Sequence, residues 1–549
     1  MKSLSIRDII GPIMIGPSSS HTAGALRIAR MCRRLLSDRP TRAVFTLYGS
    51  FARTYHGHGT DRALVAGMLG MDPDDERIRD SFELAHKADL QFELIPQHDS
   101  SDVNHPNTVD IEVEDASGAT CSMRGESIGG GAAVISRLNG IDVYLTGEYH
   151  SIVVKQYDRR GVLAHIATCL NVFDVNIATT NLFRKKKGDV AYTVMQTDDE
   201  LPEELAHAIE RNPDIIDVRI IPSDRASEPG APVKATHTEA QGFAATMTVT
   251  EAEAMLEQID FTNAKELLAY CESEELPISD AICRRERCLL ASQGIAVDDT
   301  KRYLHRALEV MRASATRPLD TPQSSMGGLI GGEAQHIAAI ENTGLADALL
   351  ARATTYAMAV LETNASMGCI VAAPTAGSSG VLPAMLLACQ DVHGFSDERL
   401  ERALANAAAI GYLITRNATV AGAEGGCQAE VGAASAMAAS AACELMGGTP
   451  RQCFAAASNA LSGLMGLVCD PIAGLVEAPC QKRNATGVAN AIVSAQIALA
   501  GIDNLVDFDQ TVEAMLRVGC SLPFELRESA LGGLAATPAA CAFCEGCTQ

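Results

Sequence analysis

The chain of 549 residues contains no tryptophan, few other aromatic residues and fewer basic than acidic side chains. Because aromatic residues make up only 4%, the core has to be built from Ala, Val, Ile, Leu and Met, and the 45 glycines allow close packing. The formal net charge of −24 argues against a nucleic-acid binder and against a protein that binds anionic membranes. With 47% hydrophobic and 20% charged residues, the composition is that of a globular chain.

The sequence also offers neither a clear secretory signal nor a clear membrane span. Arg7 and Asp8 interrupt any apolar core near the N-terminus, which argues against a signal. The longest apolar stretch, 485–502, carries three polar residues at roughly one-turn spacing, which favours a buried core helix over a span. We therefore expect a cytoplasmic protein whose 17 cysteines stay free or bind metal in a reducing compartment.

Strand-like and helical segments follow one another in an order that predicts a multidomain α+β fold. Residues 1–148 mix short alternating runs, helical segments and glycine-rich turns, which indicates an α/β domain. Residues 149–222 give strand, helix, strand, strand, helix and strand, the ferredoxin-like order. Residues 223–241 are expected to be a linker rich in Pro, Ser and Gly. Long Ala-rich helices broken by glycine predict an all-α domain over 242–536, and 537–549 form a cysteine-rich tail.

Three cysteines stand in segments rich in glycine or proline. Cys427 follows two glycines in AGAEGGCQAEVG, Cys469 precedes the proline of GLVCDPIAGL, and Cys480 lies in VEAPCQKRNA. Turns of this kind free a thiol from the regular face of a helix and can direct it into a pocket. The ten residues between Cys469 and Cys480 match neither a zinc knuckle nor a ferredoxin spacing. The residues alone leave open a metal or cluster site and a set of buried structural thiols.

Histidines with hydroxyl or amide neighbours gather in the first 150 residues, in the segments SSSHT (His21), YHGHGTD (His56 and His58) and HPNT (His105). A single histidine of this kind is more often structural, but several in distinct loop-like segments indicate a site for proton transfer near neutral pH. The three serines at 18–20 precede an expected helix whose N–H groups could bind a carboxylate. The glycines at 129–131 either permit a close backbone approach or form a plain turn.

Longer segments resemble the iron–sulfur-dependent L-serine dehydratases. The likeness to their helical domain rests on RNATVAGAEGGCQAEVG, GLVCDPIAGLVEAPCQKRNA, NASMGCIVAAPTAGSSGVLP, SSMGGLIGGEA and ESALGGLAATP. The likeness to their smaller β domain rests on GPSSSHTAGALRIA, YGSFARTYHGHGTD, HPNT and SIGGG. The middle unit resembles an ACT domain, an amino-acid-sensing module. The resemblance covers the chain apart from the linker and the tail. Two features depart from it: the ACT-like unit lies between the catalytic parts, and the tail has three cysteines.

The resemblance implies that Cys427, Cys469 and Cys480 each bind one iron of a [4Fe–4S] cluster, whose remaining iron stays open as a Lewis acid for the substrate hydroxyl. It also implies a substrate pocket lined by His21, His58, Thr60, His105, Asn107 and Ser127. Either His58 or His105 would take the proton from the substrate. A tail cysteine would enter the site when substrate is absent, with Cys541 preferred over Cys544 and Cys547. A solvent-exposed or zinc-binding tail is the alternative.

Removing ammonia from serine is also the chemistry of pyridoxal phosphate enzymes, which need a Schiff-base lysine. Residues 242–549 contain only Lys265, Lys301 and Lys482, and none lies in a glycine-rich context that could cradle a phosphate. This argues against a pyridoxal site. The run at 482–484, Lys-Arg-Asn, is expected to order the loop at Cys480 or to bind a substrate carboxylate, with surface solvation as the alternative for Lys482.

The expected function is that of a lyase that converts L-serine to pyruvate and ammonia by α,β-elimination of water. A related cluster-dependent lyase acting on L-threonine or L-cysteine remains an alternative. An iron–sulfur sensor whose ACT-like unit reads an amino acid is another. We expect that unit to bind an amino-acid effector, with L-serine as the first choice, at the helix that starts near Gly161. Pairing of such units implies a homodimer or larger assembly. A docking module without a ligand is the alternative.

Overall fold

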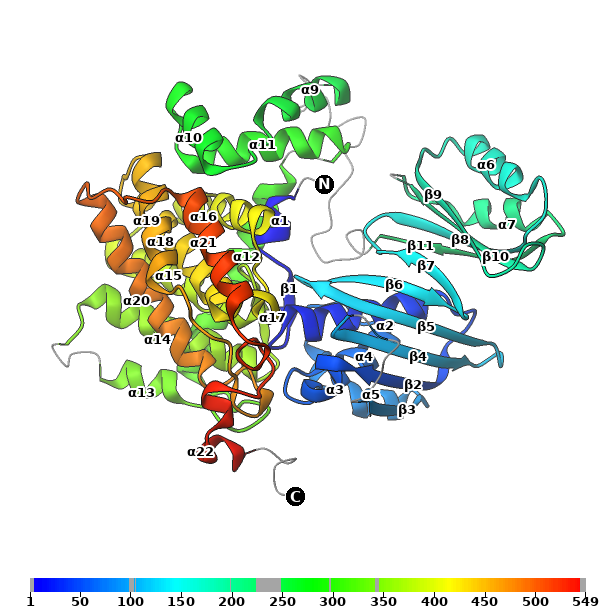
Figure 1. The fold of residues 1–549 in the computed structure, drawn as a ribbon, viewed down its shortest axis with the longest axis horizontal. Helices are drawn as coiled ribbons and strands as arrows, with labels where there is room; N and C mark the ends of the chain where they lie inside the picture. Colours follow the sequence, from blue (N-terminus) through cyan, green and yellow to red (C-terminus); the bar gives the residue numbers. More distant parts are fainter. Residues whose placement is uncertain are drawn as a thin grey trace. The chain divides into compact units, whose positions relative to one another are not determined.

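The computed structural model describes residues 4–97, 103, 105–197, 199–223, 248–295, 298–340 and 345–543. The chain forms two compact units (Figure 1). The helical unit consists of Met1–Ser19 and Pro232–Gln549, and the sheet unit consists of Ser20–Ala231. The fold is therefore mixed α+β, with a sheet-containing N-terminal region and a helical C-terminal region, as expected. Apart from Ser223, the expected linker at 223–241 lies outside the described residues.

The first sheet of the sheet unit has six strands in the order β3-β2-β4-β5-β6-β7. Their bounds are Gln91–Gln97 (β3), Pro40–Tyr48 (β2), Asn107–Asp115 (β4), Thr120–Gly129 (β5), Ala132–Leu138 (β6) and Ile141–Leu145 (β7). Only the β2–β3 pair is parallel, and the other pairs are antiparallel. The sheet is thus mostly antiparallel, unlike the α/β pattern expected for 1–148, because short turns join β4 to β7 in sequence.

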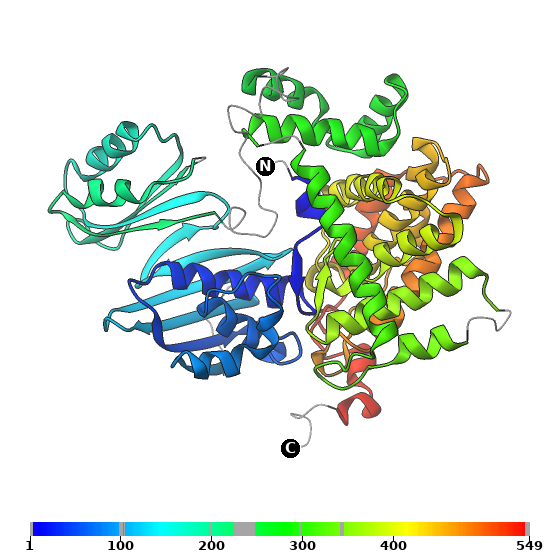
Figure 2. The same cartoon turned by 180° about the vertical axis from the view of Figure 1, so that it is seen from behind.

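Helices cover one face of this sheet (Figure 2). They are α2 (Gly24–Arg34), α3 (Gly49–Thr54), α4 (Thr60–Met68) and α5 (Ser81–Lys87). Close packing of α2 depends on two glycines. A Cβ atom at Gly125 of β5 would lie 2.3 Å from a side-chain carbon of Ile28, and one at Gly67 of α4 would lie 2.4 Å from the carbonyl oxygen of Leu26. Both faces of α2 are therefore fixed against their neighbours.

The second sheet of the sheet unit contains four antiparallel strands in the order β11-β8-β10-β9. The elements follow the chain as β8 (His150–Tyr157), α6 (Val162–Val172), β9 (Ile177–Arg184), β10 (Val190–Thr197), α7 (Glu203–Glu210) and β11 (Ile215–Ile221). Alternate residues such as Ile152 and Val154 join Ile166 of α6 and Leu205 of α7 in one apolar core. The predicted order of strands and helices is observed.

The helical unit contains long helices with many buried alanines, as predicted. Its helices of eight or more residues are α9 (Val249–Ile259), α10 (Ala264–Ser273), α11 (Ile278–Ser292), α12 (Asp299–Asp320), α14 (Ala348–Ala365), α15 (Val381–His393), α16 (Asp397–Asn417), α18 (Ala433–Leu445), α19 (Pro450–Gly463), α20 (Cys480–Leu499) and α21 (Phe508–Ser521). Shorter helices are α13 (Glu333–Ala339), α17 (Gly422–Gly425) and α22 (Pro538–Cys541). Within the described part of the chain, no helix is long and apolar enough to cross a membrane.

The N-terminal residues belong to the helical unit and not to the sheet unit that follows them in sequence. They form the short helix α1 (Ile6–Ile9) and the strand β1 (Ile13–Ile15). β1 pairs antiparallel with β12 (Cys369–Val371) in a two-stranded sheet. The predicted domain over residues 1–148 included this segment. The segment instead packs in the helical unit because its buried isoleucines contact residues hundreds of positions later in the chain, such as Val371 and Gly411.

Candidate active site

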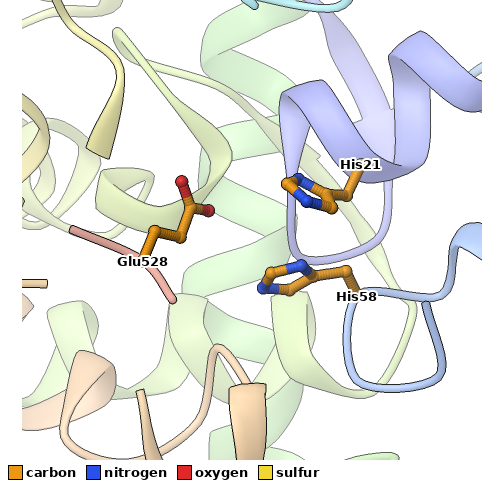
Figure 3. A group of neighbouring side chains, drawn as sticks. All are labelled: His21, His58 and Glu528. Atoms are coloured by element: carbon orange, nitrogen blue, oxygen red, sulfur yellow. The ribbon is translucent and has the colours of Figure 1, made fainter. Parts of the chain in front are cut away.

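Two histidines of the sheet unit lie side by side. His21 is part of a π-helical turn, Ser19–Ala23, that leads into α2, and His58 precedes the first turn of α4. Their ring centroids are 4.4 Å apart in an edge-on arrangement, which Figure 3 shows. Both side chains are fully buried. Glu528, which is also drawn in that figure, belongs to the helical unit and is described below.

Both ring nitrogens of His21 have hydroxyl partners. Nδ1 lies 2.9 Å from Oγ of Ser20, and Nε2 lies 2.9 Å from Oγ of Ser50. Burial, together with the nearby charges that His58 and His105 could carry, holds the pKa of His21 well below its usual value. His21 is therefore a neutral imidazole held in a hydrogen-bonded chain.

The hydrogen bonds around His58 determine which of its nitrogens carries the proton. Nδ1 lies 3.1 Å from Oγ1 of Thr54, and that hydroxyl donates its only hydrogen to the carbonyl of Ser50 at 2.8 Å. The contact therefore requires Nδ1–H of His58 to donate to Thr54. Nε2 is left as an acceptor, and it is buried without a hydrogen-bond partner among the described residues. Burial lowers the pKa of His58 to about 4.

His105 has the opposite tautomer. The backbone N–H of Asn107 donates to Nδ1 of His105 at 3.2 Å, so the proton of the neutral ring is on Nε2. Oγ1 of Thr108 donates to the carbonyl of His105 at 2.7 Å. This loop lies against the start of α3: the N–H of Ser50 donates to the carbonyl of Pro106 at 2.7 Å.

The other predicted pocket residues provide hydroxyl and amide groups. Oγ of Ser127 donates to the carbonyl of Ser20 at 2.7 Å, and Nδ2 of Asn107 lies 3.5 Å from the carbonyl of Ser127. By contrast, Oδ1 of Asn107 and Oγ1 of Thr60 are buried and have no partner among the described residues. Buried polar atoms normally have partners, so these two are available to a ligand.

The glycine run at 129–131 forms the turn between β5 and β6. All three residues have positive φ, at 100°, 58° and 80°. Among the described residues, no atom lies within 4 Å of the Cβ positions of Gly129 or Gly130. The run therefore serves the turn, and at these two positions no protein backbone approaches closely.

The helical unit brings the three predicted cysteines to one place. Cys427 lies between α17 and a π-helical turn, Gln428–Gly432, and Cys480 is the first residue of α20. A hydrogen-bonding contact with Cys427, followed by burial, raises the pKa of Cys469. Burial, followed by the charge of Cys427, raises the pKa of Cys480. Three thiols that are 42 and 11 positions apart in sequence thus lie near one another, with Cys427 and Cys469 buried and Cys480 partly buried.

Two carboxyl groups, which the sequence analysis did not single out, lie at the same place. Oε2 of Glu430 lies 4.0 Å from Sγ of Cys469, and Oγ1 of Thr375 donates to Oε1 at 2.9 Å. Burial raises the pKa of Glu430 to about 7. The N–H of Glu528 donates to the carbonyl of Cys469 at 2.8 Å, and burial, followed by the charge of Glu430, raises its pKa to about 8.

A signal for one of these carboxyl groups was present in the sequence. Glu430 follows Cys427 by three positions, a spacing that places two residues on one side of a helix. Glu528 begins the ESALGGLAATP segment and has a φ of +59°, which is rare outside glycine. Nothing in the sequence indicated this backbone conformation.

In the run at 482–484, one residue is exposed and the other two are hydrogen-bonded to neighbouring loops. Lys482 is exposed, which matches surface solvation. Arg483 donates to the carbonyl of Val468 at 2.9 Å and pairs with Asp470 at 2.7 Å. Asn484 accepts from the N–H of Gly380 and donates to the carbonyl of Cys480. Arg483 and Asn484 therefore order the loops around Cys469 and Cys480.

The tail offers one described cysteine. Cys541 ends α22 and is partly buried, with Sγ 3.9 Å from the carbonyl oxygen of Ala535. Cys544 and Cys547 lie outside the described residues. The prediction that one of the three enters the site remains a prediction.

Comparison with known protein families covers both units. The serine dehydratase alpha chain family matches residues 237–535, which is more than half of the chain. The serine dehydratase beta chain family matches residues 5–137. The alpha-chain match contains all three converging cysteines, and the beta-chain match contains the predicted pocket residues.

Known relatives occur both as separate chains and as one chain. The L-serine dehydratase alpha chain of Peptoniphilus asaccharolyticus is 44% identical over 274 residues, which cover 50% of this chain and 93% of that one. The beta chain from the same organism is 41% identical over 209 residues, which cover 38% of this chain and 94% of that one. The L-serine dehydratase of Streptomyces coelicolor is 29% identical over 543 residues, covering 97% and 98%. The chain belongs to the serine dehydratase family and carries its alpha-chain and beta-chain regions in one polypeptide.

Proposed function

We propose that this chain is an L-serine dehydratase, which eliminates water from L-serine and yields pyruvate and ammonia, with a [4Fe–4S] cluster as its cofactor. The observation that carries the proposal is the convergence of Cys427, Cys469 and Cys480 in the unit that matches the alpha-chain family. Thiolates are the ligands that iron–sulfur clusters take in proteins. Two buried thiols and one partly buried thiol would fit a cluster that keeps one iron free of protein ligands. When bound, the cluster supplies a Lewis acid for the substrate hydroxyl.

Within the sheet unit, we assign the removal of the Cα proton to His58. A general base needs a lone pair on a nitrogen that nothing else occupies. In the tautomers set by their hydrogen bonds, Nε2 of His58 has that lone pair, whereas the free nitrogen of His105 carries a hydrogen. Both nitrogens of His21 are already bonded. The low pKa of His58 keeps it in the basic form at neutral pH.

Two further residues are proposed to bind the polar ends of the substrate. Oγ1 of Thr60 can donate a hydrogen bond to the carboxylate of L-serine, and Oδ1 of Asn107 can accept one from its ammonium group. Both atoms are buried without partners in the described part of the chain. His21 and Ser127 position this set, because each contacts Ser20 at the start of the turn that carries His21.

The proposed regulatory unit is 149–222, which we interpret as ACT-like on its strand order and its two helices on one side. Its helix α6 begins after Gly161, which has a φ of +89° and no side-chain cap, so the first N–H groups are free to bind a carboxylate. Oε1 of Gln156 and Oγ1 of Thr193 are buried without partners among the described residues. We propose an amino-acid effector, L-serine first, and a homodimer or larger assembly in which these units pair.

The proposal is tested with protein purified without oxygen and assayed for pyruvate from L-serine. Replacing Cys469 with Ser should remove both the visible absorbance of the cluster and the activity. The control is Cys389→Ser in α15, a buried thiol outside the site, which should keep both. Full activity of the Cys469 variant, or of metal-free wild type, would refute the cluster.

A second set of variants tests whether His58 is the general base. His58→Gln should keep the cluster but lower kcat by about 10²- to 10⁴-fold and abolish exchange of the Cα hydrogen of L-serine with deuterated water. Thr54→Val removes the acceptor that fixes the tautomer and should lower kcat by a smaller factor. If His105→Gln stops the exchange while His58→Gln leaves it intact, the assignment is wrong.

A further inference from the structure

The segment 4–15 lies in the beta-chain match from residue 5 onward, but it is built into the helical unit. Six of its apolar side chains are buried almost completely, at 9% exposure or less: Ile6, Ile9, Ile10, Ile13, Met14 and Ile15. A surface of the alpha-type unit is thus complementary to a piece of beta-type sequence. We call residues 4–15 the docking segment.

The helical half of the docking segment is held by a buried carboxylate. Oγ of Ser5 and the N–H of Ile6 donate to Glu286 of α11, at 2.5 Å and 3.1 Å. The adjacent Arg285 donates to the carbonyl of Leu4 at 2.8 Å. Glu286 and Arg285 are both about 1% exposed. The N–H of Ile6 at the start of the helix turn is therefore matched to a carboxylate, and the carbonyl of Leu4 to a positive group.

Shape complementarity on this half involves a glycine of α16. A Cβ atom at Gly411 would lie 2.4 Å from Cγ2 of Ile9 and 3.0 Å from Sδ of Met437. Ile9 therefore occupies space that the missing side chain of Gly411 leaves. The contact excludes any larger residue at either position without a shift of the backbone.

The strand half of the docking segment, β1, pairs with one edge of β12. The register pairs Ile13 with Val371, Met14 with Ile370 and Ile15 with Cys369. The N–H of Ala372 donates to the carbonyl of Pro12 at 3.1 Å, and the hydroxyl of Tyr303 in α12 donates to the carbonyl of Ile10 at 2.6 Å. β12 has no other strand partner in the described residues, so without β1 both of its edges would lack hydrogen bonds.

We propose that the groove formed by α11, α16, α12 and β12 is a docking site for the N-terminal segment of a beta-type polypeptide, which binds by adding one helix turn and one strand. The partner is defined by its chemistry: a helix turn opened by a hydroxyl residue, followed by an apolar strand. Here the partner is the chain itself. In relatives that are named as separate alpha and beta chains, a second polypeptide would supply the segment. The inference rests on packing and is independent of the reaction.

The test uses the full chain with a specific protease site inserted between 224 and 247. After cleavage, the two pieces should elute together from a size-exclusion column. Glu286→Gln should raise the concentration at which they separate by about tenfold, since it weakens bonds to a buried charge. The matched control is Glu444→Gln, another buried carboxylate of the helical unit, which bonds to Ser279 and Asn406 and does not touch the segment.

A disulfide provides a readout that does not depend on the stability of the variants. Ile15→Cys places a thiol opposite native Cys369, and oxidation by a small organic disulfide, which is itself reduced to two thiols, should join them. After cleavage the joined pieces should run as one band on a non-reducing denaturing gel. Ile13→Cys faces Val371 and should give two bands. Two bands from Ile15→Cys, or equal weakening by the two glutamine variants, would overturn the proposal.

Discussion

At the scale of single residues, the buried histidine His58 makes stability depend on pH in a defined direction. Its pKa is about 4 in the folded protein, against 6.5 for an ordinary histidine. Below pH 6.5 the unfolded chain binds a proton that the folded chain does not, so the free energy of unfolding falls as the pH falls toward 4. Between pH 7.5 and 5.5, the protonation of this one group should lower the free energy of unfolding by about 1.4 kcal/mol.

Urea unfolding of metal-free protein at the two pH values checks this dependence. His58→Gln should reduce the loss of stability by about that amount, since glutamine does not titrate. His86→Gln is the control variant, because this histidine lies at the end of α5 with its side chain exposed. An unchanged slope in the His58 variant would contradict the buried neutral state.

The hydroxyl of Thr60 should act in the opposite sense on stability and on substrate binding. Because Oγ1 is buried without a partner in the described structure, replacing it with the methyl group of valine removes an unfavourable buried polar atom. Thr60→Val should leave the melting temperature equal or higher and raise KM about tenfold, the value of one hydrogen bond to a charged group. A drop in stability would instead indicate a structural role.

The sequence could indicate which residues gather but not how their hydrogens are arranged. Histidine, threonine and asparagine in separate polar segments, and three cysteines beside turns, were sufficient for a set of candidates. The choice between His58 and His105 needed the partners of Nδ1, which are a side chain one helix turn away in one case and a backbone N–H in the other. Glu430 was missed because a single carboxylate in an alanine- and glycine-rich helix has many solvated counterparts.

At the scale of elements, the start of α3 should be intolerant of any side chain. Gly49 has a φ of +56°, and a Cβ atom there would lie 2.5 Å from the carbonyl oxygen of Pro106, in the loop that carries His105. Gly49→Ala should lower the free energy of unfolding by about 3 kcal/mol, because backbone strain and the steric overlap act together. Gly70→Ala has a similar φ of +84° in open space and should cost only about 1 kcal/mol.

Thermal unfolding of the two alanine variants measures this difference. We expect the Gly49 variant also to lose activity, because Ser50 and Thr54 of the same helix contact His21 and His58. Equal melting temperatures for the two variants would contradict the close approach of Pro106.

Elements with strong local periodicity were predictable, whereas their distant partners were not. The order of strands and helices over 149–222 follows from alternating and helical patterns that lie within a few residues of each other. The position of the docking segment does not, because the partner of Ile15 is Cys369, more than three hundred residues away. The orientation of the strands in the first sheet was also not predictable, since a run such as 43–48 has the same residue pattern in parallel and in antiparallel pairs.

At the scale of the whole molecule, the proposed effector site predicts a regulatory variant that keeps the chemistry. Ala164 is exposed in the first turn of α6, where an aspartate would occupy the free N–H groups and suit the helix dipole. Ala164→Asp should therefore fold normally but repel the carboxylate of an effector. We expect the serine saturation curve to lose any sigmoidal shape while the maximal rate is kept.

Steady-state kinetics with L-serine on the cluster-loaded enzyme provide the measurement. Thr168→Asp places the same charge one turn further along, away from the free N–H groups, and should leave the curve unchanged. Deletion of 149–222 with a flexible replacement should resemble the Ala164 variant. Loss of all activity in a folded, cluster-loaded deletion would count against a purely regulatory unit.

The docking segment also has a consequence for synthesis on the ribosome. Its six apolar side chains are made before β12 and the glycine of α16 against which they pack, which follow more than 350 residues later in the sequence. At a translation rate of about 5–20 residues per second, the strand half of the segment lacks its partner strand β12 for roughly 20–70 seconds. During that interval the nascent chain exposes an isoleucine-rich strand, and a chaperone that binds apolar nascent segments should raise the yield of correctly folded protein.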